Sequence, residues 1–420
     1  MDSGNGYEVK DIKLAEQGLR NIEWARQHMK ALMQVKSRFS KDKPLKGIKI
    51  GMALHVTKET ALLVETLIAG GAEVAITGCN PLSTQDDVAA ALAKQGVKVW
   101  AYKGETHDDY YRYINNVIRF APQITIDDGC DLVTQIHLNH KYLIKEIMGG
   151  CEETTTGILR LHAMEKSSAL QYPIIAVNDN MTKHLFDNYY GTGQSTLDGI
   201  IRATNILFAG KTVVVCGYGD CGKGVSQRAK GMGAEVIVTE VHPVRALKAK
   251  MDGFRVMPID EASKLGDIFI TVTGGKHALA REHFVLMRDG AILANSGHFD
   301  IEVDVAGLHK MAKKVTRVRE CLEEFDLGKK KLYLCGEGRL VNLACAEGHP
   351  SEVMSTSFCG QALACEYIAK NKGKLLPKVH KLPEELDLEI AKLQLDAMGV
   401  KIDTLTKEQK AYLASWKEGT

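Results

Sequence analysis

Hydrophobic side chains over residues 11–40 recur every three or four positions, a spacing that predicts one amphipathic helix. From residue 47 onward, short apolar stretches with an alternating pattern are separated by helical ones. The predicted strands cover residues 47–55, 73–78, 97–102, 124–129 and 173–179. We expect Thr57 to cap the helix after the first strand, and Ser83 or Thr84 to cap the helix over 86–96. This alternation predicts an α/β fold with a doubly wound parallel sheet.

Polar residues follow the predicted strands at the points where the strands end. His55 follows the first strand and Asn80 follows the second, while Asp127, Asp128 and Asp131 follow the fourth. In open α/β sheets, ligands bind beyond the carboxyl ends of the strands. One such acid could simply cap a helix, but polar residues at several strand ends together predict a single shared cleft.

A second α/β unit contains a glycine-rich turn between a strand and a helix. Residues 211–240 read as strand, turn, helix and strand, and the turn has the pattern Gly-x-Gly-x-x-Gly at Gly217, Gly219 and Gly222. This context predicts that a dinucleotide pyrophosphate binds at the N-terminus of the helix. Glu240 ends the next strand, where an acid would bond a ribose 2′-hydroxyl and favour NAD over NADP.

Charge and composition limit the classes of partner. The 420 residues include 54 Lys plus Arg and 52 Asp plus Glu, so we expect neither nucleic acid nor membrane as a partner. No stretch approaches the roughly 18 apolar residues of a membrane span, and the N-terminus does not resemble a secretory signal. The ten cysteines lack the spacing of metal ligands, so we predict no metal site. These features predict a cytoplasmic protein.

Several longer motifs resemble one known family, the S-adenosylhomocysteine hydrolases. The matching strings span nearly the whole chain and most resemble the archaeal, methanogen-like branch; they are NPLSTQDD (80–87), IDDGCDL (126–132), EETTTG (152–157), NDNMTKHLFDNYYGTGQS (178–195), GYGDCGKG (217–224), NSGHFD (295–300) and EGRLVNLACAEGHP (337–350). The resemblance implies a resident NAD that oxidises the 3′-hydroxyl of a nucleoside thioether. Homocysteine then leaves by β-elimination, water adds, and the ketone is reduced again, so that NAD is not consumed.

The resemblance also implies the catalytic residues. Lys183 and Asp187 stand four apart, so on a helix they share a face, and the lysine is expected to take part in removing the 3′-hydroxyl proton. A lysine shielded from water can have a lowered pKa and act as a base, although a surface ion pair has the same spacing. The other catalytic candidates are Asp131 as a base or stabiliser at C4′ and Glu153 as a carboxylate at the ribose. His55 and His298 are the candidate proton shuttles.

Binding residues follow from the same matched motifs. The substrate candidates are Thr57 and Glu59 at the purine, Met354 and Phe358 in the base pocket, Thr154 at the ribose, and Asn188 and His349. Core packing is the alternative for Met354 and Phe358. The cofactor candidates are Gly217, Gly219, Asp220, Gly222, Glu240, Arg245, Asn295 and Asn342, with Asn342 at the nicotinamide carboxamide. Two positions depart from the pattern of many members: Thr192 replaces a cysteine, and Glu347 replaces a methionine near the base.

The predicted organisation has three parts. Residues 1–181 and 351–384 form a substrate-binding domain, residues 192–350 form an NAD-binding Rossmann domain, and residues 385–420 form a C-terminal helical extension. The family is usually a homotetramer. S-adenosyl-L-homocysteine is the first substrate candidate and S-inosyl-L-homocysteine the alternative, since Glu59 could accept from an adenine amine or from hypoxanthine N1–H. A plain NAD-dependent dehydrogenase and an NAD-sensing module are the other functions weighed.

Overall fold

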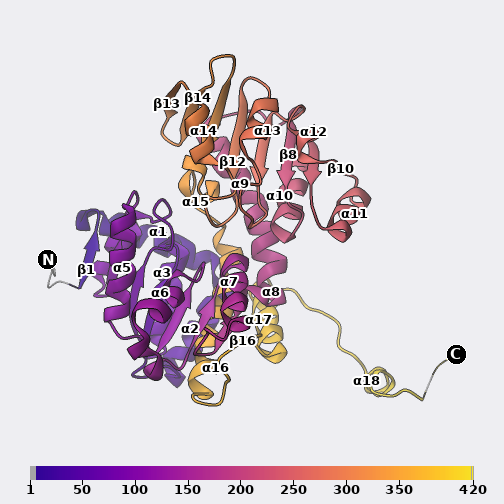
Figure 1. Cartoon of the computed structure of the whole chain (residues 1–420). Helices are drawn as coiled ribbons and strands as arrows, with labels where there is room; N and C mark the ends of the chain where they lie inside the picture. The colour runs from indigo at the N-terminus through magenta and orange to yellow at the C-terminus, as the bar shows by residue number, and fades with distance from the viewer. Residues whose placement is uncertain (1–5, 418, 420) are drawn as a thin grey trace.

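A computed structural model describes residues 6–417 and residue 419. The chain folds into two α/β units, each built around an eight-stranded sheet (Figure 1). Strands from residues 7–176 and 379–380 form the first sheet, and strands from residues 212–335 form the second. Among the described residues, no helix combines the length and the apolar character needed to span a membrane.

Every strand pair in the first sheet is parallel, as the alternation of strands and helices predicts. The strands lie in the order β1-β4-β3-β2-β5-β6-β7-β16. Their bounds are β1 (Tyr7–Val9), β2 (Lys49–Ala53), β3 (Glu73–Thr77), β4 (Lys98–Ala101), β5 (Ile124–Asp127), β6 (Gly149–Glu152), β7 (Ile174–Ala176) and β16 (Val379–His380). The chain order reverses between β2 and β5, so their carboxyl ends flank a crevice of the kind that binds ligands.

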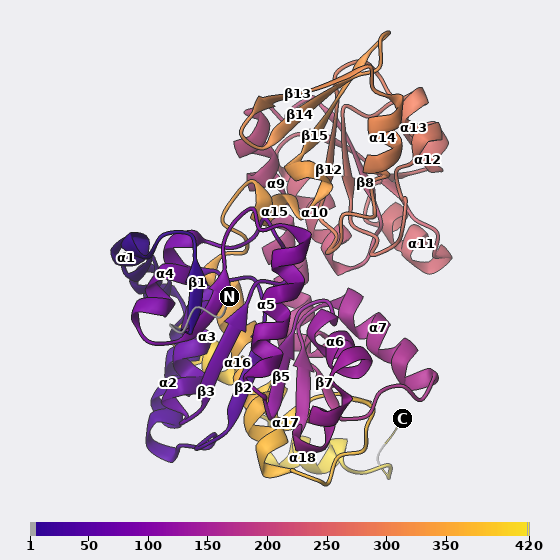
Figure 2. The same ribbon diagram turned by 60° about the vertical axis from the view of Figure 1, so that its left-hand side comes forward.

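Helices cover both faces of this sheet (Figure 2). One face carries α1 (Ala15–His28), α2 (Lys30–Asp42), α3 (Lys58–Ala69), α4 (Asp86–Lys94) and α16 (Ser351–Lys370), whose apolar side chains share one core cluster with the strands. The other face carries α5 (His107–Arg119), α6 (Asp131–Asn139) and α7 (Thr155–Lys166) around a second cluster. The short 3-10 segments are η1 (Ile12–Leu14), η2 (Lys141–Glu146) and η3 (Val177–Asp179).

Two local predictions for this unit were wrong. The single helix over 11–40 breaks at Met29, which has φ −105° and ψ 49° and lets α1 and α2 turn separately onto the core. The helix over 86–96 begins at Asp86 after Gln85, and neither Ser83 nor Thr84 caps it. Thr57 does cap α3, because its hydroxyl accepts a hydrogen bond from the Thr60 amide.

The second sheet has the order β10-β9-β8-β11-β12-β15-β14-β13. Its strands are β8 (Thr212–Cys216), β9 (Glu235–Thr239), β10 (Arg255–Val256), β11 (Ile268–Thr271), β12 (Ala291–Asn295), β13 (Lys314–Arg319), β14 (Leu322–Asp326) and β15 (Lys331–Cys335). Strand β14 pairs antiparallel with both β13 and β15, so this sheet is mixed where a purely parallel one was predicted. The loops around β14 are too short for a crossover connection, and antiparallel pairing is what such loops allow.

Helices again form two layers on this sheet. One core cluster joins it to α9 (Thr192–Thr204), α10 (Asp220–Gly231), α11 (Pro243–Met251) and α15 (Val341–Ala344). The other joins it to α12 (Ile259–Ala262), α13 (Arg281–Leu286) and α14 (Val305–Met311). A single-turn 3-10 segment, η5 (Gly336–Gly338), leads from β15 toward α15.

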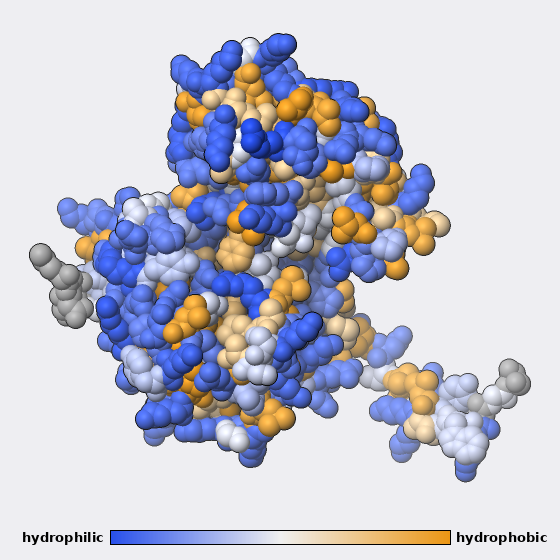
Figure 3. Space-filling view, viewed as in Figure 1, coloured by the Kyte–Doolittle hydropathy of each residue, from blue (hydrophilic) through white to orange (hydrophobic). Residues whose placement is uncertain are grey.

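Two connections join the units. The outgoing one runs through α8 (Met181–Lys183), the π-helical segment η4 (His184–Gly191) and α9, and the returning one leads from α15 to α16. The predicted C-terminal extension divides in two: α17 (Glu384–Ala397) packs against α16 and α2. The chain beyond α17, including α18 (Lys407–Leu413), stands away from the body (Figures 1 and 3). Its apolar side chains, Val400, Ile402, Leu405 and Leu413 among them, are exposed.

Candidate active site

A cavity of about 1220 Å³ lies between the two units and is lined by residues from both. A typical site for one small ligand measures roughly 300–1,000 Å³, so this space is large enough for more than one. The lining includes the ends of β2, β5 and β6 from the first unit and the glycine-rich turn and β9 from the second. A cleft is therefore present at the strand ends and the second unit extends it, but of the strand-end residues named for it only His55 and Asp128 line it, and Asn80, Asp127 and Asp131 do not.

The glycine-rich turn has the backbone geometry of a pyrophosphate site. Gly217 adopts φ +107°, and a Cβ there would lie 2.8 Å from the Val272 carbonyl oxygen. A Cβ on Gly222 would lie 2.1 Å from the Gly217 oxygen, so this position needs glycine for the close approach of turn and helix. A Cβ on Gly219 would meet no protein atom within 4 Å and would project where a ligand must come close.

Residues around the turn fit the remaining parts of a dinucleotide. The Glu240 carboxylate accepts hydrogen bonds from the amides of Tyr218 (2.8 Å), Val241 (2.7 Å) and His242 (2.9 Å), and Glu240 and Arg245 both line the cavity. Asp220 also lines it and pairs with Lys223 (3.0 Å) and His184 (3.0 Å).

Asn342 carries a further polar group that a cofactor would satisfy. Its Nδ2 donates to Ser195 Oγ at 3.1 Å, but its buried Oδ1 has no hydrogen-bond partner among the described residues. Because an unpartnered buried acceptor is costly and Asn342 lines the cavity, this oxygen fits a ligand amide such as a nicotinamide carboxamide.

Asn295 does not join the cofactor candidates in the cavity. Its side chain is fully buried and donates to the carbonyls of Gly297, Phe299 and Gly338, while its oxygen accepts from Thr271 and the Gly297 amide. With these groups satisfied inside the protein, Asn295 shapes the loop that carries His298 and is absent from the cavity lining. The placement of Asn295 at the cofactor is therefore corrected.

Lys183, Asp187 and Glu153 form the first of two ionisable clusters in the cavity, which we call the lysine cluster. Lys183 Nζ lies 3.4 Å from Asp187 Oδ1, 3.7 Å from Glu153 Oε1 and 2.8 Å from Asn188 Oδ1. The four residues are buried, with Lys183 only 5% exposed. Asp187 also lies 3.4 Å from His349 Nδ1, which links the cluster to the connection between the units.

The expected lowering of the Lys183 pKa was wrong. Burial does act to lower it, but the charges of Asp187 and Glu153 outweigh burial and raise the pKa of Lys183 above its usual value. Glu153 is the second carboxylate beside Lys183, and it accepts hydrogen bonds from Ser357 and Gln361 of α16. Burial raises the pKa of Glu153 to about 7, against the opposing effect of Lys183. Glu153 therefore takes up or releases its own proton near neutral pH, while Lys183 keeps its positive charge.

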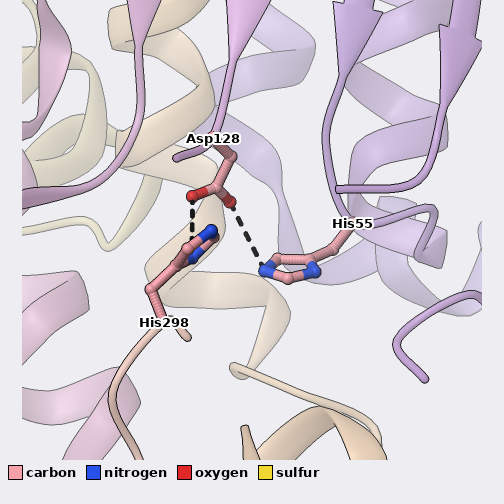
Figure 4. Close-up of side chains that lie close together, drawn as sticks. All are labelled: His55, Asp128 and His298. Carbon is pink, nitrogen blue, oxygen red and sulfur yellow. Dashed lines mark ion pairs between the residues drawn. The ribbon is translucent and has the colours of Figure 1, made fainter. Parts of the chain in front are cut away.

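His55, Asp128 and His298 form the second cluster, which we call the histidine cluster (Figure 4). The Asp128 carboxylate lies between the two rings, 3.4 Å from His55 Nε2 and 3.5 Å from His298 Nδ1. His298 comes from the loop after β12 in the second unit, so the cluster exists only because the units meet. A Cβ on Gly129 would lie 2.3 Å from His298 Nε2, which shows how closely they approach. Burial lowers the pKa of His55 to about 4, against the effect of Asp128.

Asp128 takes the place in the cavity that was predicted for Asp131. Asp131 begins α6, outside the cavity lining, where it pairs with Arg160 at 2.7 Å and accepts a hydrogen bond from Tyr110 at 2.9 Å. The two acids differ because Gly129 (φ +105°) and Cys130 (φ +68°) turn the chain sharply between them. The sequence signal that could have separated the acids is the glycine directly after Asp128.

The remaining substrate candidates also line the cavity. They are Thr57, Glu59, Thr154, Asn188, His349, Met354 and Phe358. Glu59 is buried and accepts a hydrogen bond from Ser351 at 2.6 Å. Phe358 also belongs to the hydrophobic core, so packing and cavity lining are compatible there. The neighbour missed from the sequence is Lys58, whose Nζ lies 3.4 Å from Glu59 and 3.0 Å from Glu347. Thr192, which replaces the cysteine of many family members, lies 3.2 Å from His349.

Two imidazoles and one carboxylate can also bind a divalent metal. The ligand atoms of His55, Asp128 and His298 lie within 4.8 Å of one another. The absence of a metal site stays a prediction.

Comparison with known proteins gives whole-chain matches. The sequence profile described as "S-adenosyl-L-homocysteine hydrolase" matches residues 6–143, and the one described as "S-adenosyl-L-homocysteine hydrolase, NAD binding domain" matches residues 188–348. The chain is 62% identical over 414 residues to the S-inosyl-L-homocysteine hydrolase of Methanocaldococcus jannaschii, covering 99% of this chain and 100% of that protein. It is 57% identical over 415 residues to the adenosylhomocysteinase of Sulfolobus acidocaldarius, again with 99% and 100% coverage.

Proposed function

Because this chain belongs to the S-adenosyl-L-homocysteine hydrolase family, we propose that it reversibly hydrolyses S-adenosyl-L-homocysteine to adenosine and L-homocysteine. The observation that carries this proposal is one cavity that unites a dinucleotide turn with two proton-transfer clusters. A simple dehydrogenase needs only a hydride acceptor and one acid–base group. The second cluster, drawn from both units, suits a reaction that must also move protons at C4′, at sulfur and at water.

NAD binding follows from the matched NAD-binding profile and fits the residues present. The Gly217–Gly222 turn would hold the pyrophosphate, Glu240 a ribose hydroxyl and Asn342 the carboxamide. Bound NAD would supply a reversible hydride acceptor for C3′. Glu240→Ala should weaken NAD binding by about 10-fold and relax discrimination against NADP, because the carboxylate repels a 2′-phosphate. Titration of both nucleotides measures this, and an unchanged preference would contradict the assignment of Glu240.

The lysine cluster is placed to manage the proton of the 3′-hydroxyl. Lys183 is held as a cation by Asp187 and Glu153, so it can take up that proton only by passing one of its own to a neighbour. Glu153 is the suitable acceptor because its pKa is raised to about 7 by burial. The remaining positive charge near O3′ then favours the ketone, which acidifies the C4′ hydrogen.

The histidine cluster is placed to manage the protons of elimination and hydration. Loss of the C4′ proton breaks the C5′–S bond, and the departing thiolate needs a proton. Water then adds at C5′, and this water must lose a proton. His55 and His298, sharing Asp128, can accept the first proton and return it, since the Asp128 carboxylate stabilises the charged imidazole that forms in between.

The direct test is to incubate the purified protein with S-adenosyl-L-homocysteine and titrate the released thiol. We expect homocysteine release without accumulation of free NADH, and none from the 3′-deoxy analogue. Stoichiometric free NADH would indicate a plain dehydrogenase. Equal release from the 3′-deoxy analogue would contradict the oxidation step. Full activity of Lys183→Ala would favour a non-catalytic NAD-sensing role.

S-inosyl-L-homocysteine is a second candidate substrate that one observation favours. Lys58 Nζ lies beside the purine carboxylate Glu59 and is held there by Glu347. A cation next to a carboxylate matches the O6 acceptor and N1–H donor of hypoxanthine, whereas adenine presents an amine and an acceptor. Comparing kcat/KM for the two thioethers decides the question. An inosyl preference above about 10-fold, or about 1.4 kcal/mol of transition-state binding, would replace the adenosyl compound as the proposed substrate.

Three broader features complete the proposal. The protein acts in the cytoplasm as a homotetramer, in which the apolar chain beyond α17 contacts a neighbouring subunit. The division into substrate-binding and NAD-binding domains corresponds to the two sheets, and the domains close around the substrate. Light scattering should give about four times the chain mass of 46.1 kDa, and X-ray scattering should show a more compact particle with the nucleoside bound. A monomeric mass or an unchanged profile would contradict these points.

A further inference from the structure

The turn between β3 and α4 contacts His55 through a residue that has no role in capping the helix. Ser83 is 3% exposed, and its Oγ lies 2.7 Å from His55 Nδ1. The other ring nitrogen, Nε2, lies 3.4 Å from Asp128 Oδ2 at the cavity. The contact of Ser83 is therefore on the side of the ring away from Asp128, where it can decide which nitrogen carries the hydrogen.

The single hydroxyl proton of Ser83 is directed elsewhere. Ser83 Oγ donates to the carbonyl oxygen of Asn80 at 3.1 Å, within a turn that the Ser83 amide and the Asn80 side chain also close. The Asn80 carbonyl can only accept, so when the one hydroxyl proton points to it, Ser83 Oγ is left to accept from His55. The hydrogen of a neutral His55 ring then lies on Nδ1, and the Nε2 lone pair faces the cavity.

A second neighbour favours the opposite arrangement. Cys79 Sγ lies 3.2 Å from His55 Nδ1. Burial raises the pKa of this thiol well above its usual value, so it retains a proton that it could donate to Nδ1. A thiol is a weak donor, and the shorter contact to Ser83 prevails while the hydroxyl is present. Asp128, from the turn after β5, would also accept a hydrogen on Nε2, but its 3.4 Å contact is longer than that of Ser83. The other ionisable groups near His55 are His298, from the second unit, His349 and Asp187.

We propose that Ser83 is a positioning residue, which fixes the Nδ1–H tautomer of His55 and so keeps its Nε2 ready to accept a proton in the cavity. Ser83 does not touch the reacting atoms and acts through His55 alone. The inference rests on the proposed function, because the nitrogen must serve the elimination and hydration steps. It also predicts that a change at Ser83 slows elimination and hydration but not 3′-oxidation, since the lysine cluster does not depend on His55.

The test compares Ser83→Ala with Ser83→Thr, which keeps the hydroxyl. Ser355→Ala is the control, since Ser355 is a buried serine of the same unit that accepts a hydrogen bond from the Leu32 amide and does not line the cavity. In Ser83→Ala we expect kcat for homocysteine release to fall by about 10²-fold, within the range of general acid–base catalysis. KM and the rate of 3′-oxidation, followed by the absorbance of bound reduced nicotinamide, should change by less than about 3-fold. Ser83→Thr should recover most of the loss.

Nitrogen-15 NMR of histidine-labelled protein gives a readout independent of activity. The His55 ring should carry its hydrogen on Nδ1 in the wild type, and the hydrogen should move to Nε2 in Ser83→Ala, where only Cys79 remains. Wild-type His55 with its hydrogen on Nε2 would overturn the proposal, as would equal losses in 3′-oxidation and in homocysteine release. If the wild type released no homocysteine at all, the proposed function would fail, while the NMR result would still test Ser83.

Discussion

Burial acts to lower the pKa of both Lys183 and His55, yet the two groups end in opposite charge states. Lys183 stays charged because two carboxylates, Asp187 and Glu153, lie within 4 Å of its Nζ. His55 is held neutral because burial lowers its pKa by more than the nearby Asp128, which also contacts His298, raises it. The number of opposite charges within about 4–6 Å therefore decides whether a buried group keeps its charge. The cavity thus contains one fixed cation, Lys183, and in His55 one buried imidazole that stays neutral.

The largest effect should come from removing the fixed cation. Lys183→Ala should slow 3′-oxidation by about 10³-fold or more, since it removes the charge at O3′ and leaves Asp187 and Glu153 unpaired. Single-turnover absorbance of bound reduced nicotinamide measures the step. Lys36→Ala, which breaks a partly exposed ion pair with Glu65 in the first unit, is the control and should leave the rate unchanged. A near-normal rate in Lys183→Ala would remove this lysine from the mechanism.

Asp128→Asn should produce the next largest effect, about 10²-fold on homocysteine release. The amide keeps the shape of the side chain but cannot stabilise a proton on either imidazole. Asp131→Asn is the matched control, because Asp131 lies in the same turn but pairs with Arg160 outside the cavity. We expect homocysteine release by Asp131→Asn to slow by less than about 10-fold. A larger loss in Asp131→Asn than in Asp128→Asn would reverse our assignment of the two acids.

The clusters should also differ in their dependence on pH. Glu153, with its pKa raised to about 7, is protonated below that pH and cannot accept a proton from Lys183. The rate of 3′-oxidation should therefore rise with pH up to about 7 and then level off. His55, with its pKa lowered to about 4, stays neutral over this range and should contribute no such change. Glu153→Gln should be slow and independent of pH near neutrality, and a midpoint near 7 in that variant would refute the assignment.

The smallest effect is expected at Thr192, where many family members have cysteine. Its hydroxyl lies 3.2 Å from His349 Nε2 and 3.6 Å from Cys221 Sγ, at the edge of the lysine cluster. A thiol can make both contacts, so Thr192→Cys should change kcat/KM by less than about 3-fold. A gain or loss beyond 10-fold in steady-state assays would show that this position tunes the oxidation step.

The dinucleotide turn could be predicted from the sequence because all of its determinants are local. Gly217, Gly219 and Gly222 lie within six residues, and the strand and helix that flank them are recognisable. The parallel sheets follow from the alternation of elements in the same way. The antiparallel end of the second sheet was missed, because the short loops around β14 carry the information and the charged strands resemble surface segments.

The charge states of the clusters could not be predicted because they depend on contacts between distant segments. Desolvation of Lys183 can be inferred from its motif, but Glu153 comes from another strand end and reverses the direction of the pKa shift. Asp128 meets His298 across the two units, at a sequence distance that spacing cannot reveal. Asp131 matched the family motif equally well, and only the turn at Gly129 separates the two acids.

The close approach of Gly129 to His298 has a consequence for capturing the protein in a different arrangement. A single methyl group on Gly129 would occupy the space of the His298 ring, and the backbone there, at φ +105°, also disfavours any larger residue. A Gly129→Ala substitution would thus act as a spacer between the two halves of the molecule. It offers a means of crystallising the form that admits and releases ligands, with every catalytic side chain left in place.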